Sequence, residues 1–355
     1  MNNENNFNFK KKLNENTRFD DILKYVDIEI RNILSKISSK HKKVIEEIRL
    51  RVNQPLMLSL NGLDYFIDNF SQLYTNPKTD FYIVEKKFID KTFQLCCNHS
   101  IYAYEEDIKR GFITLKGGHR IGIVGSAIHG NKGIETIKDI TSLNLRISKE
   151  IIGTSDKILP YVIKNEDTIY HTLIVSPPQC GKTTLLRDLI RNISNGTKLK
   201  DFKGLKVGVL DERLEISGMY NGIPQMNLGI RTDVLTSCPK YEGIMLLIRS
   251  MSPQVIATDE LGGKNDIVAI HEALKAGIKL IATVHGENLN DIMRKPYLDE
   301  IMKENIFEKI IILDNSNGIG TIKDVINCDK KLYRKKENYN AYNKNSRQPD
   351  GSYIL

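Results

Sequence analysis

The sequence predicts an α/β protein in which an amino-terminal α+β domain precedes a domain built on a largely parallel sheet. Its 355 residues are enough for two domains, each with a core of its own. Apolar residues make up 40% of the chain and charged residues 27%, a balance typical of soluble globular proteins. In the second half, short β-branched runs alternate with helical patterns, which favours parallel strands with helices on both faces of the sheet.

The amino-terminal domain, residues 1–150, opens with an amphipathic pattern. Apolar residues recur at spacings of three and four over Phe19–Ile37, which predicts one helix packed on the domain core. Around Gly117-Gly118 apolar and polar residues alternate, and we expect a β-hairpin there with Arg120–Val124 as its second strand. Between these two features, short strands separated by turn signals are predicted at Glu47–Arg51, Leu56–Leu60 and Tyr82–Val84.

The second domain, residues 151–329, contains the alternation of strands and helices. A final hairpin that turns at Asn317-Gly318 is expected to add Thr321–Ile326 as an edge strand. The other strands are predicted at Thr172–Val175, Leu205–Leu210, Val255–Thr258, Lys279–Val284 and Lys309–Leu313.

Residues 330–355 form a basic tail. It holds seven basic and two acidic residues, a net charge of +5 out of +8 for the whole chain. Because the tail has no apolar periodicity, we expect it to be disordered in isolation. The apolar runs of the chain are too short for a membrane helix, and its amino terminus lacks the pattern of a secretory signal, so we expect a cytoplasmic protein.

The strongest chemical signal is a strand, a loop and a helix in the order that binds phosphate. The segment TLIVSPPQCGKTTLLRDLI contains an apolar strand, the pattern S-x-x-x-x-G-K-T and an amphipathic helix. Loop amides and the helix dipole favour phosphate charge, so the pattern predicts binding of ATP with Mg²⁺. We expect Lys182 to reach the outer phosphates, Thr183 to ligate Mg²⁺ and Thr184 to donate to an inner phosphate. The predicted nucleotide-binding residues are Ser176, Pro177, Pro178, Gln179, Cys180, Gly181, Lys182, Thr183 and Thr184.

A second acidic site follows the predicted strand Val255–Thr258. Asp259 and Glu260 come at the carboxyl end of this strand, where ligands bind in open α/β sheets. One carboxylate can hold magnesium through water, while the other orients or deprotonates the attacking water. We therefore predict Asp259 and Thr183 as metal-binding residues; which carboxylate is the base stays open.

Two further groups follow predicted strands. Asp211, Glu212 and Glu215 come after the strand that ends at Leu210, and they add carboxylates to the same edge of the sheet. His285 follows the strand that ends at Val284, a position from which it could sense the terminal phosphate, although a lone histidine after a strand is more often structural.

Two arginines are candidates for charge neutralisation. Arg231 and Arg249 could stabilise charge that develops on phosphate, in the same subunit or across an interface. From charge alone they could equally be surface residues.

Three long segments carry a resemblance to a known family. They are VGVLDERLEISG, GIPQMNLGIRTDVLTSCPKYEGIMLLIRSMSPQVIATDELGG and AGIKLIATVHG, and over about residues 47–327 the chain resembles the stage III sporulation AA family of endospore-forming bacteria. That family is similar to the type II and type IV secretion and pilus ATPases. The resemblance implies a RecA-like P-loop ATPase domain behind the amino-terminal domain, assembled as a hexameric ring.

The resemblance also implies roles for single residues. Ser176–Thr184 looks like the Walker A loop and Glu260 like the Walker B glutamate. Ser176 and Gln179 depart from the more usual glycine-containing loop, and Asp259 stands where pilus ATPases often have a glycine. Of the remaining site residues, the implied catalytic ones are Glu212 and Glu215 of an acidic box, His285 of a histidine box, Arg231 and Arg249. Two arginines of the amino-terminal domain, Arg120 and Arg146, are implied to reach the phosphates of a neighbouring copy.

The biology implied by the resemblance is a motor or a nucleotide-controlled switch in the mother cell. Its implied partners are the other copies of its ring and the membrane proteins of a channel complex that joins mother cell and forespore. Two alternatives stay open: a ring scaffold that binds ATP with little turnover, and a RecA-like nucleic-acid motor. We rank nucleic acid last as a partner, because a short basic tail with scattered tyrosines is more often a solvated segment.

Overall fold

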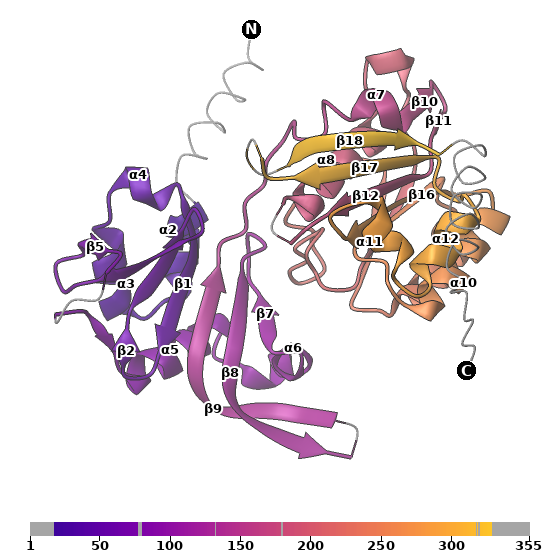
Figure 1. Cartoon of the computed structure of the whole chain (residues 1–355). Coiled ribbons are helices and arrows are strands. Elements are labelled where there is room, and N and C mark those ends of the chain that lie inside the picture. Colours follow the sequence, from indigo (N-terminus) through magenta and orange to yellow (C-terminus); the bar gives the residue numbers. More distant parts are fainter. Residues whose placement is uncertain are drawn as a thin grey trace, which may run out of the picture. The chain divides into compact units, whose positions relative to one another are not determined.

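The computed structural model describes residues 18–76, 80–131, 133–178, 180–316, 318 and 320–328 (Figure 1). They form two compact units: the first runs to Glu150 and includes Gly218–Met226, and the second comprises Ile151–Ser217 and the residues from Asn227 onward. The basic tail predicted for residues 330–355 lies outside the described residues. None of the helices within the described part is both long enough and apolar enough to cross a bilayer.

The first unit is built on a seven-stranded antiparallel sheet in the order β5-β4-β3-β1-β9-β8-β7. Buried residues of its helices and of the sheet form one core, in which Phe19, Ile48 and Phe88 are almost fully buried. Its strands are β1 Ile45–Arg51, β2 Gln54–Pro55, β3 Met57–Leu60, β4 Leu63–Ile67, β5 Leu73–Tyr74, β6 Ile83–Val84, β7 Phe112–Thr114, β8 Arg120–Gly130 and β9 Gly133–Arg146. Its helices are α2 Arg18–Ile22, η1 Leu23–Tyr25, α3 Ile28–Ser35, α4 Ser39–Lys42, α5 Lys86–Cys96, η2 Ile101–Tyr104 and α6 Glu105–Lys109.

The single helix predicted over Phe19–Ile37 is wrong in one respect, because the helix is broken in its middle. Val26 is extended, with φ −98° and ψ 143°, and Asp27 caps the start of α3 by accepting the N–H of Glu29 at 2.9 Å. The N–H of Asp27 donates to Thr92 Oγ1 on α5 at 3.1 Å. Aspartate is favoured at the N-cap of a helix and disfavoured in a helix interior. A new helix therefore starts after Asp27 instead of the first helix continuing through it. The apolar residues on both sides of the break are still buried in the core.

The hairpin predicted around Gly117-Gly118 is confirmed. β7 and β8 pair in antiparallel register, with Ile113 opposite Ile121, and the two glycines have φ of +89° and +75°. Such positive φ values suit glycine, which has no Cβ to clash. β8 continues beyond the predicted end at Val124 to Gly130, because it also pairs with the long strand β9.

The second unit is built on a seven-stranded sheet in the order β14-β13-β15-β16-β12-β17-β18. All neighbours are parallel except β17 and β18, the yellow hairpin at one edge (Figure 1). The five predicted strands are confirmed, and Thr321–Asn327 pairs with β17 as the predicted edge strand, whereas β14 was not predicted. Asn317 of the predicted turn lies outside the described residues. Its strands are β10 Ile163–Asn165, β11 Thr168–Ile169, β12 Thr172–Ser176, β13 Val207–Asp211, β14 Thr232–Thr236, β15 Val255–Thr258, β16 Lys279–His285, β17 Lys309–Asp314 and β18 Thr321–Asn327.

Helices cover both faces of this sheet. Alternate residues of β12 point into different cores: Leu173 and Val175 pack with residues of α9 to α12, whereas Ile174 packs with residues of α7 and α8. This alternation follows from the period of two in a strand. The helices are α7 Leu159–Val162, α8 Lys182–Asn195, η3 Leu199–Asp201, α9 Lys240–Met251, α10 Lys264–Lys275, α11 Leu289–Met293 and α12 Leu298–Lys303.

Candidate functional site

The carboxyl edge of the parallel sheet brings the candidate residues together. β12, β16, β15 and β13 are successive neighbours, so the loops that follow them meet at one edge. Ser176 at the end of β12 lies opposite His285 at the end of β16 in the strand register. Asp259 follows β15, and Asp211 ends β13. Ligands bind at this edge in open α/β folds because polar loop groups and helix amino termini converge there.

The phosphate loop leads into α8 through a glycine. Gly181 has φ +84° and ψ 16°, a left-handed conformation that favours glycine, and its carbonyl accepts the N–H of Leu185 at 2.9 Å. α8 begins at the next residue, Lys182, whose side chain is only 9% exposed. Thr183 and Thr184 lie in the first turn, where backbone N–H groups have no partner within the helix. The predicted strand, loop and helix are therefore arranged as an anion site requires.

The loop itself starts without a glycine because its first residue stays extended. Ser176 is fully buried as the last residue of β12; its hydroxyl donates to Pro177 O at 2.8 Å, and its carbonyl accepts the N–H of Gly286 at 3.1 Å. Pro178 is exposed, and Cys180 is buried with its carbonyl bound to the N–H of Gly320 at 3.1 Å. The predicted phosphate contact of Gln179 lies outside the described residues.

Thr183 and Asp259 form the oxygen pair predicted to hold magnesium. The Thr183 hydroxyl donates to Asp259 Oδ2 at 2.8 Å, and Asp259 Oδ1 accepts the N–H of Glu260 at 3.0 Å and the hydroxyl of Thr283. Hydroxyl and carboxylate oxygens are the donors that Mg²⁺ prefers, and it keeps water and phosphate oxygens for the rest of its shell. The chemistry and the spacing of this pair fit Mg²⁺. Among the described residues no group of three or more His, Cys, Asp or Glu side chains forms a metal cluster of another kind.

Glu260 is held between two cations. Its Oε1 lies 3.9 Å from Lys182 Nζ, and its Oε2 forms an ion pair with Arg213. Its backbone has φ +51°, an uncommon conformation for a residue with a side chain, and it is stabilised where the Glu260 N–H donates to Thr283 Oγ1 at 2.9 Å. Strained backbone of this kind concentrates at functional sites. At this residue the carboxylate lies 3.9 Å from the lysine of the phosphate loop.

The loop after β13 is organised by its first acidic residue. The buried Asp211 carboxylate accepts four hydrogen bonds, from the N–H groups of Glu215, Ile216 and Ser217 at 2.8, 3.1 and 2.7 Å and from the Ser217 hydroxyl at 2.6 Å. Arg187 of α8 donates to the carbonyls of Ile216 and Glu215, both at 2.8 Å. Asp211 and Arg187 therefore fix this loop to the helix that follows the phosphate loop.

The two acidic residues predicted to work in this loop lie beside the magnesium pair. Glu212 and Glu215 line one hollow together with Asp259 and Glu260. Glu212 is partly exposed and forms an ion pair with Lys240 at 2.6 Å, at the start of α9. The structure thus gathers four carboxylates of the predicted site in one place.

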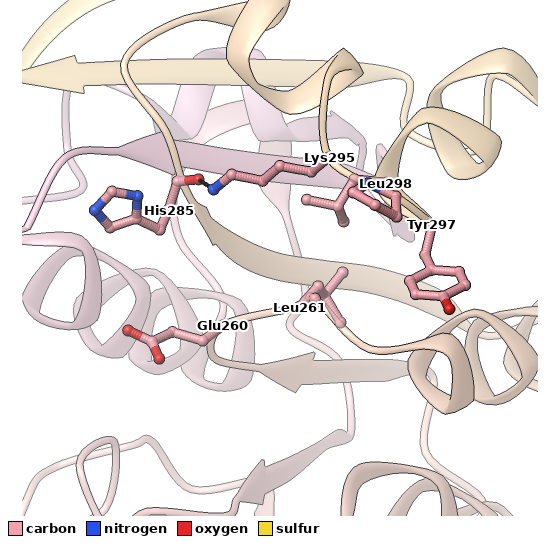
Figure 2. A pocket seen from close by; sticks show the side chains of 8 residues that line it. Glu260, Leu261, His285, Lys295, Tyr297 and Leu298 are labelled. Atoms are coloured by element: carbon pink, nitrogen blue, oxygen red, sulfur yellow. Dashed lines mark hydrogen bonds between the residues drawn. The ribbon is translucent and has the colours of Figure 1, made fainter.

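His285 lies at the same edge with its side chain exposed (Figure 2). It lines a pocket together with Glu260, Leu261, Gly262 and residues 295–298. Figure 2 shows the ammonium of Lys295 at the backbone carbonyl of His285, to which it donates a hydrogen bond. His285 and Glu260 therefore line one hollow.

The other predicted arginines lie elsewhere. Arg231 precedes β14 at the amino edge of the sheet, and it donates to the carbonyl of Ser194 at 2.7 Å, in the last turn of α8. Arg249 is exposed in the last turn of α9, the end that leads back to the amino edge. Within one chain, neither lies with the phosphate loop.

The two arginines of the first unit are neighbours. Arg120 of β8 and Arg146 of β9 are opposite each other in register. Arg120 lies over the ring of Phe112, 3.5 Å from its centroid, and Arg146 is 3.3 Å from Glu47. Like charges opposite each other cost stability, which the ring and the carboxylate offset here.

Several residues of the site carried no assignment from the sequence. They are Thr283, which binds Asp259; Arg187, which holds the acidic loop; and Lys240 and Lys295. Only Arg187 carried a detectable signal, because an arginine within the apolar pattern of α8 needs a partner when buried. The others depend on which loops the fold brings together.

A family model described as sporulation stage III, protein AA, matches residues 16–332 of the chain. The stage III sporulation protein AA of Bacillus subtilis (strain 168) is 39% identical over 300 residues, which cover 84% of this chain and 92% of that protein. The uncharacterized protein ycf45 of Cyanidium caldarium is 28% identical over 219 residues, 61% of this chain and 58% of that protein.

Solved structures of a pilus retraction motor and of a bacterial ATPase have a similar fold. The pilus retraction motor PilT with bound ADP matches 91% of this chain and 90% of its own with a TM-score of 0.57 and 13% identity. The ATPase DotB of Legionella pneumophila matches 86% of this chain and 84% of its own with a TM-score of 0.53 and 15% identity. At these identities the likeness concerns the fold alone, and it confirms the predicted RecA-like P-loop class.

Proposed function

The chain belongs to the family of sporulation stage III, protein AA, and on that basis we propose that it hydrolyses Mg-ATP to drive or gate a channel complex during sporulation. One observation carries the proposal: Thr183, Asp259, Lys182 and Glu260 are connected at the carboxyl edge of the sheet. The threonine hydroxyl is 2.8 Å from the aspartate, and the lysine is 3.9 Å from the glutamate. A site that only binds phosphate needs neither the uncommon backbone conformation of Glu260 nor its position close to Lys182.

Each of these residues has a role in binding. The amides at the start of α8 and the ammonium of Lys182 would bind the phosphates of ATP, and Thr183 and Asp259 would hold magnesium. Bound magnesium would neutralise charge on the phosphate oxygens. The hydroxyl of Thr283, bound to Asp259, keeps that carboxylate oriented.

Hydrolysis follows by attack of water on the terminal phosphorus. A bond forms between the water oxygen and phosphorus while the bond to the bridging oxygen breaks, which leaves ADP and phosphate. Glu260 accepts a proton from the attacking water. Its carboxylate lies beside Lys182, the residue that binds the outer phosphates, and it is partly exposed, so water can reach it there. Glu212, Glu215 and His285 line the same edge and position water and the terminal phosphate.

The arginines remote from the phosphate loop are assigned to contacts between copies. Arg231, Arg249, Arg120 and Arg146 act on the nucleotide of a neighbouring copy in a ring, which we propose to be a hexamer. The solved relatives with this fold are named as motors and ATPases, in agreement with such a machine. The ring works in the mother cell at the membrane facing the forespore, with the membrane proteins of the channel complex as its partners.

The first test is phosphate release by the purified protein with Mg-ATP over a range of protein concentrations. We expect turnover that rises with protein concentration as the ring assembles. Lys182→Ala should abolish nucleotide binding, whereas Glu260→Gln should keep binding and lower turnover by about 10³-fold. The exposed pair Lys203 and Glu166, 3.1 Å apart in the same unit, supplies matched controls: Lys203→Ala and Glu166→Gln should leave both unchanged.

The outcomes separate the proposal from the alternatives. Unchanged turnover in both site variants would contradict it. Background turnover with ATP-dependent assembly would instead favour the ring scaffold that binds ATP without using it. The nucleic-acid motor predicts binding to single strands that is lost on deletion of residues 330–355.

A further inference from the structure

The acidic loop after β13 also presents Arg213 to the nucleotide site. The loop backbone is fixed at both ends of its turn, by Asp211, which accepts the N–H of Ser217 at 2.7 Å, and by Arg187, which holds the carbonyl of Glu215 at 2.8 Å. The Arg213 side chain is 63% exposed. Because the backbone is fixed and the side chain is exposed, the guanidinium can move without remodelling the loop.

Two cations share the Glu260 carboxylate, one on each oxygen. Lys182 Nζ lies 3.9 Å from Oε1, and Arg213 contacts Oε2. Lys182 is the lysine of the phosphate loop, so the carboxylate occupies an anionic position within reach of a phosphate-binding group. A terminal phosphate is a second anion of suitable geometry for the same two cations, because guanidinium groups bind phosphate through paired oxygens.

We propose that Arg213 is the residue that recognises the terminal phosphate of ATP, by exchanging the Glu260 carboxylate for that phosphate. The proposal rests on the function proposed above and adds a catalytic arginine from the same chain. The exchange has two consequences. Arg213 stabilises charge on the phosphate, and Glu260 loses the cation that held its Oε2, so the carboxylate is free to take a proton from water.

The exchange makes the site sensitive to the number of phosphates. ADP has no terminal phosphate to compete with Glu260, so Arg213 stays on the carboxylate and Glu260 stays inactive. With ATP, both cations gain a phosphate partner. Binding of ATP therefore breaks the ion pair between Arg213 and Glu260, whereas binding of ADP leaves it in place.

The placement of the other arginines supports this choice. Arg231 donates to carbonyls in the last turn of α8, and Arg249 lies in the last turn of α9, both away from the phosphate loop of their own chain. Arg187 is buried with its guanidinium bound to loop carbonyls. Arg213, by contrast, is at the carboxyl edge and reaches the residue beside Lys182.

The test compares Arg213→Gln and Arg213→Lys with the wild-type full-length protein. Equilibrium binding of ATP and of ADP is measured with fluorescent analogues in Mg²⁺, and phosphate release is measured on the same samples. We expect Arg213→Gln to lower kcat about 100-fold and ATP affinity about tenfold, with ADP affinity changed less than twofold. Arg213→Lys should restore part of both, because it keeps the charge. Lys203→Gln is the control, since Lys203 forms an exposed pair with Glu166 at 3.1 Å, away from the site.

Two results would overturn the proposal. The first is an unchanged ratio of ATP to ADP affinity in Arg213→Gln, whether neither affinity falls or both fall equally; an equal fall would make Arg213 a general structural or binding residue. The second is wild-type kcat in Arg213→Gln. If the wild-type protein binds ATP but has no turnover, the function proposed above fails, yet the affinity ratio still decides whether Arg213 recognises the terminal phosphate.

Discussion

Glu308 at the amino edge of the parallel sheet and Glu260 at its carboxyl edge are held in different ways. Glu308 accepts the backbone N–H of His171 at 2.9 Å beside the ammonium of Lys279 at 3.2 Å, and His171 Nδ1 accepts the N–H of Leu280 at 3.2 Å. The two oxygens of the Glu260 carboxylate instead pair with side chains, those of Lys182 and Arg213. Bonds to a fixed backbone maintain structure, whereas pairs between mobile side chains can be exchanged for a ligand.

The pKa values at the amino edge are consistent with this difference. Burial lowers the pKa of His171 to about 4, and the charge of Lys279 adds to the effect. Burial alone would raise the pKa of Glu308, but the hydrogen bond from the His171 N–H and the charge of Lys279 outweigh it, so its pKa is lowered. Both groups are therefore held in one charge state at neutral pH, as expected for structural groups.

The largest difference in turnover is expected between two variants that each remove one carboxylate, one at the carboxyl edge and one at the amino edge. Asp259→Asn should lower turnover about 10³-fold, roughly 4 kcal/mol of barrier, because it removes a charged partner of Thr183 from the proposed magnesium site. Glu308→Gln at the amino edge should leave turnover unchanged and cost about 1 kcal/mol of the free energy of unfolding, because its ion pairs are partly exposed. Phosphate release and urea unfolding of both variants measure the contrast. Equal effects on turnover would refute the division between the edges.

A second effect concerns Asp188, on the helix that connects the two edges. Its buried carboxylate accepts the N–H and hydroxyl of Ser155 at 2.8 and 2.7 Å and pairs with Arg191 at 2.7 Å. Asp188→Asn should therefore lower the free energy of unfolding by about 3 kcal/mol, because an amide cannot replace the charge and brings donors toward donors. Urea unfolding tests it. Asp167→Asn, which affects an exposed pair with Lys203, is the control and should change stability by less than about 0.5 kcal/mol.

The pKa of Asp188 gives this prediction a pH dependence. Burial would raise it, but hydrogen bonds from Ser155 and Arg191 outweigh burial and lower it. The stabilisation is thus fully present above the pKa of an unfolded aspartate, about 3.9, and is lost as pH falls through the lower folded value. The difference in the free energy of unfolding between wild type and Asp188→Asn should be constant from about pH 5 to 8 and should shrink only in stronger acid.

The sequence could predict the elements whose signal is local. The apolar strands β12, β15, β16 and β17 and the loop between β12 and α8 were all predicted, because buried parallel strands have continuous apolar runs and phosphate loops have a fixed spacing. β14 was not, since its residues TDVLT are only partly buried and read as a polar segment. The break at Asp27 was missed because the apolar periodicity continues through it.

The candidate site was predictable only in part. Lys182, Thr183, Asp259 and Glu260 lie next to strand ends, and strand ends can be located from the sequence. The partner of Asp259, Thr283, is on another strand whose neighbour is set by the sheet order, which no local pattern gives. Likewise, the placement of Arg231 at the amino edge depends on β14 itself. Residues joined by topology alone therefore needed the structure.

A third, smaller effect is a loss of stability in weak acid caused by His171 and by His119 of the first unit. Burial lowers the pKa of His119 to about 4, and the charge of Arg18 adds to the effect. A histidine has a pKa of about 6.5 when unfolded, so between about pH 6.5 and 4 the unfolded chain binds more protons. The free energy of unfolding should therefore fall as pH falls, by up to about 1.4 kcal/mol per pH unit for each histidine.

His171→Asn tests this slope. The asparagine carbonyl can accept the N–H of Leu280 as the ring nitrogen does, but it does not titrate. Urea unfolding of the second unit at about pH 7, 6 and 5 should show a shallower dependence in the variant than in the wild type. Identical slopes would mean that His171 does not lose its proton affinity on folding.

The smallest expected effect is that of Glu212→Gln on stability. Glu212 pairs with Lys240 at 2.6 Å; the side chain of Lys240 is 11% exposed, but that of Glu212 is 41% exposed, so solvent screens the pair, and glutamine keeps an oxygen that can accept from the ammonium. We expect the free energy of unfolding to change by less than about 0.5 kcal/mol, and turnover to fall less than tenfold, because Glu212 lines the hollow beside Asp259 without contacting the magnesium pair. Urea unfolding and phosphate release measure both quantities. A stability loss of about 2 kcal/mol would instead place Glu212 among the carboxylates that maintain the fold, as Glu308 does. The pair of Glu212 with Lys240 would then not be one that a ligand can replace.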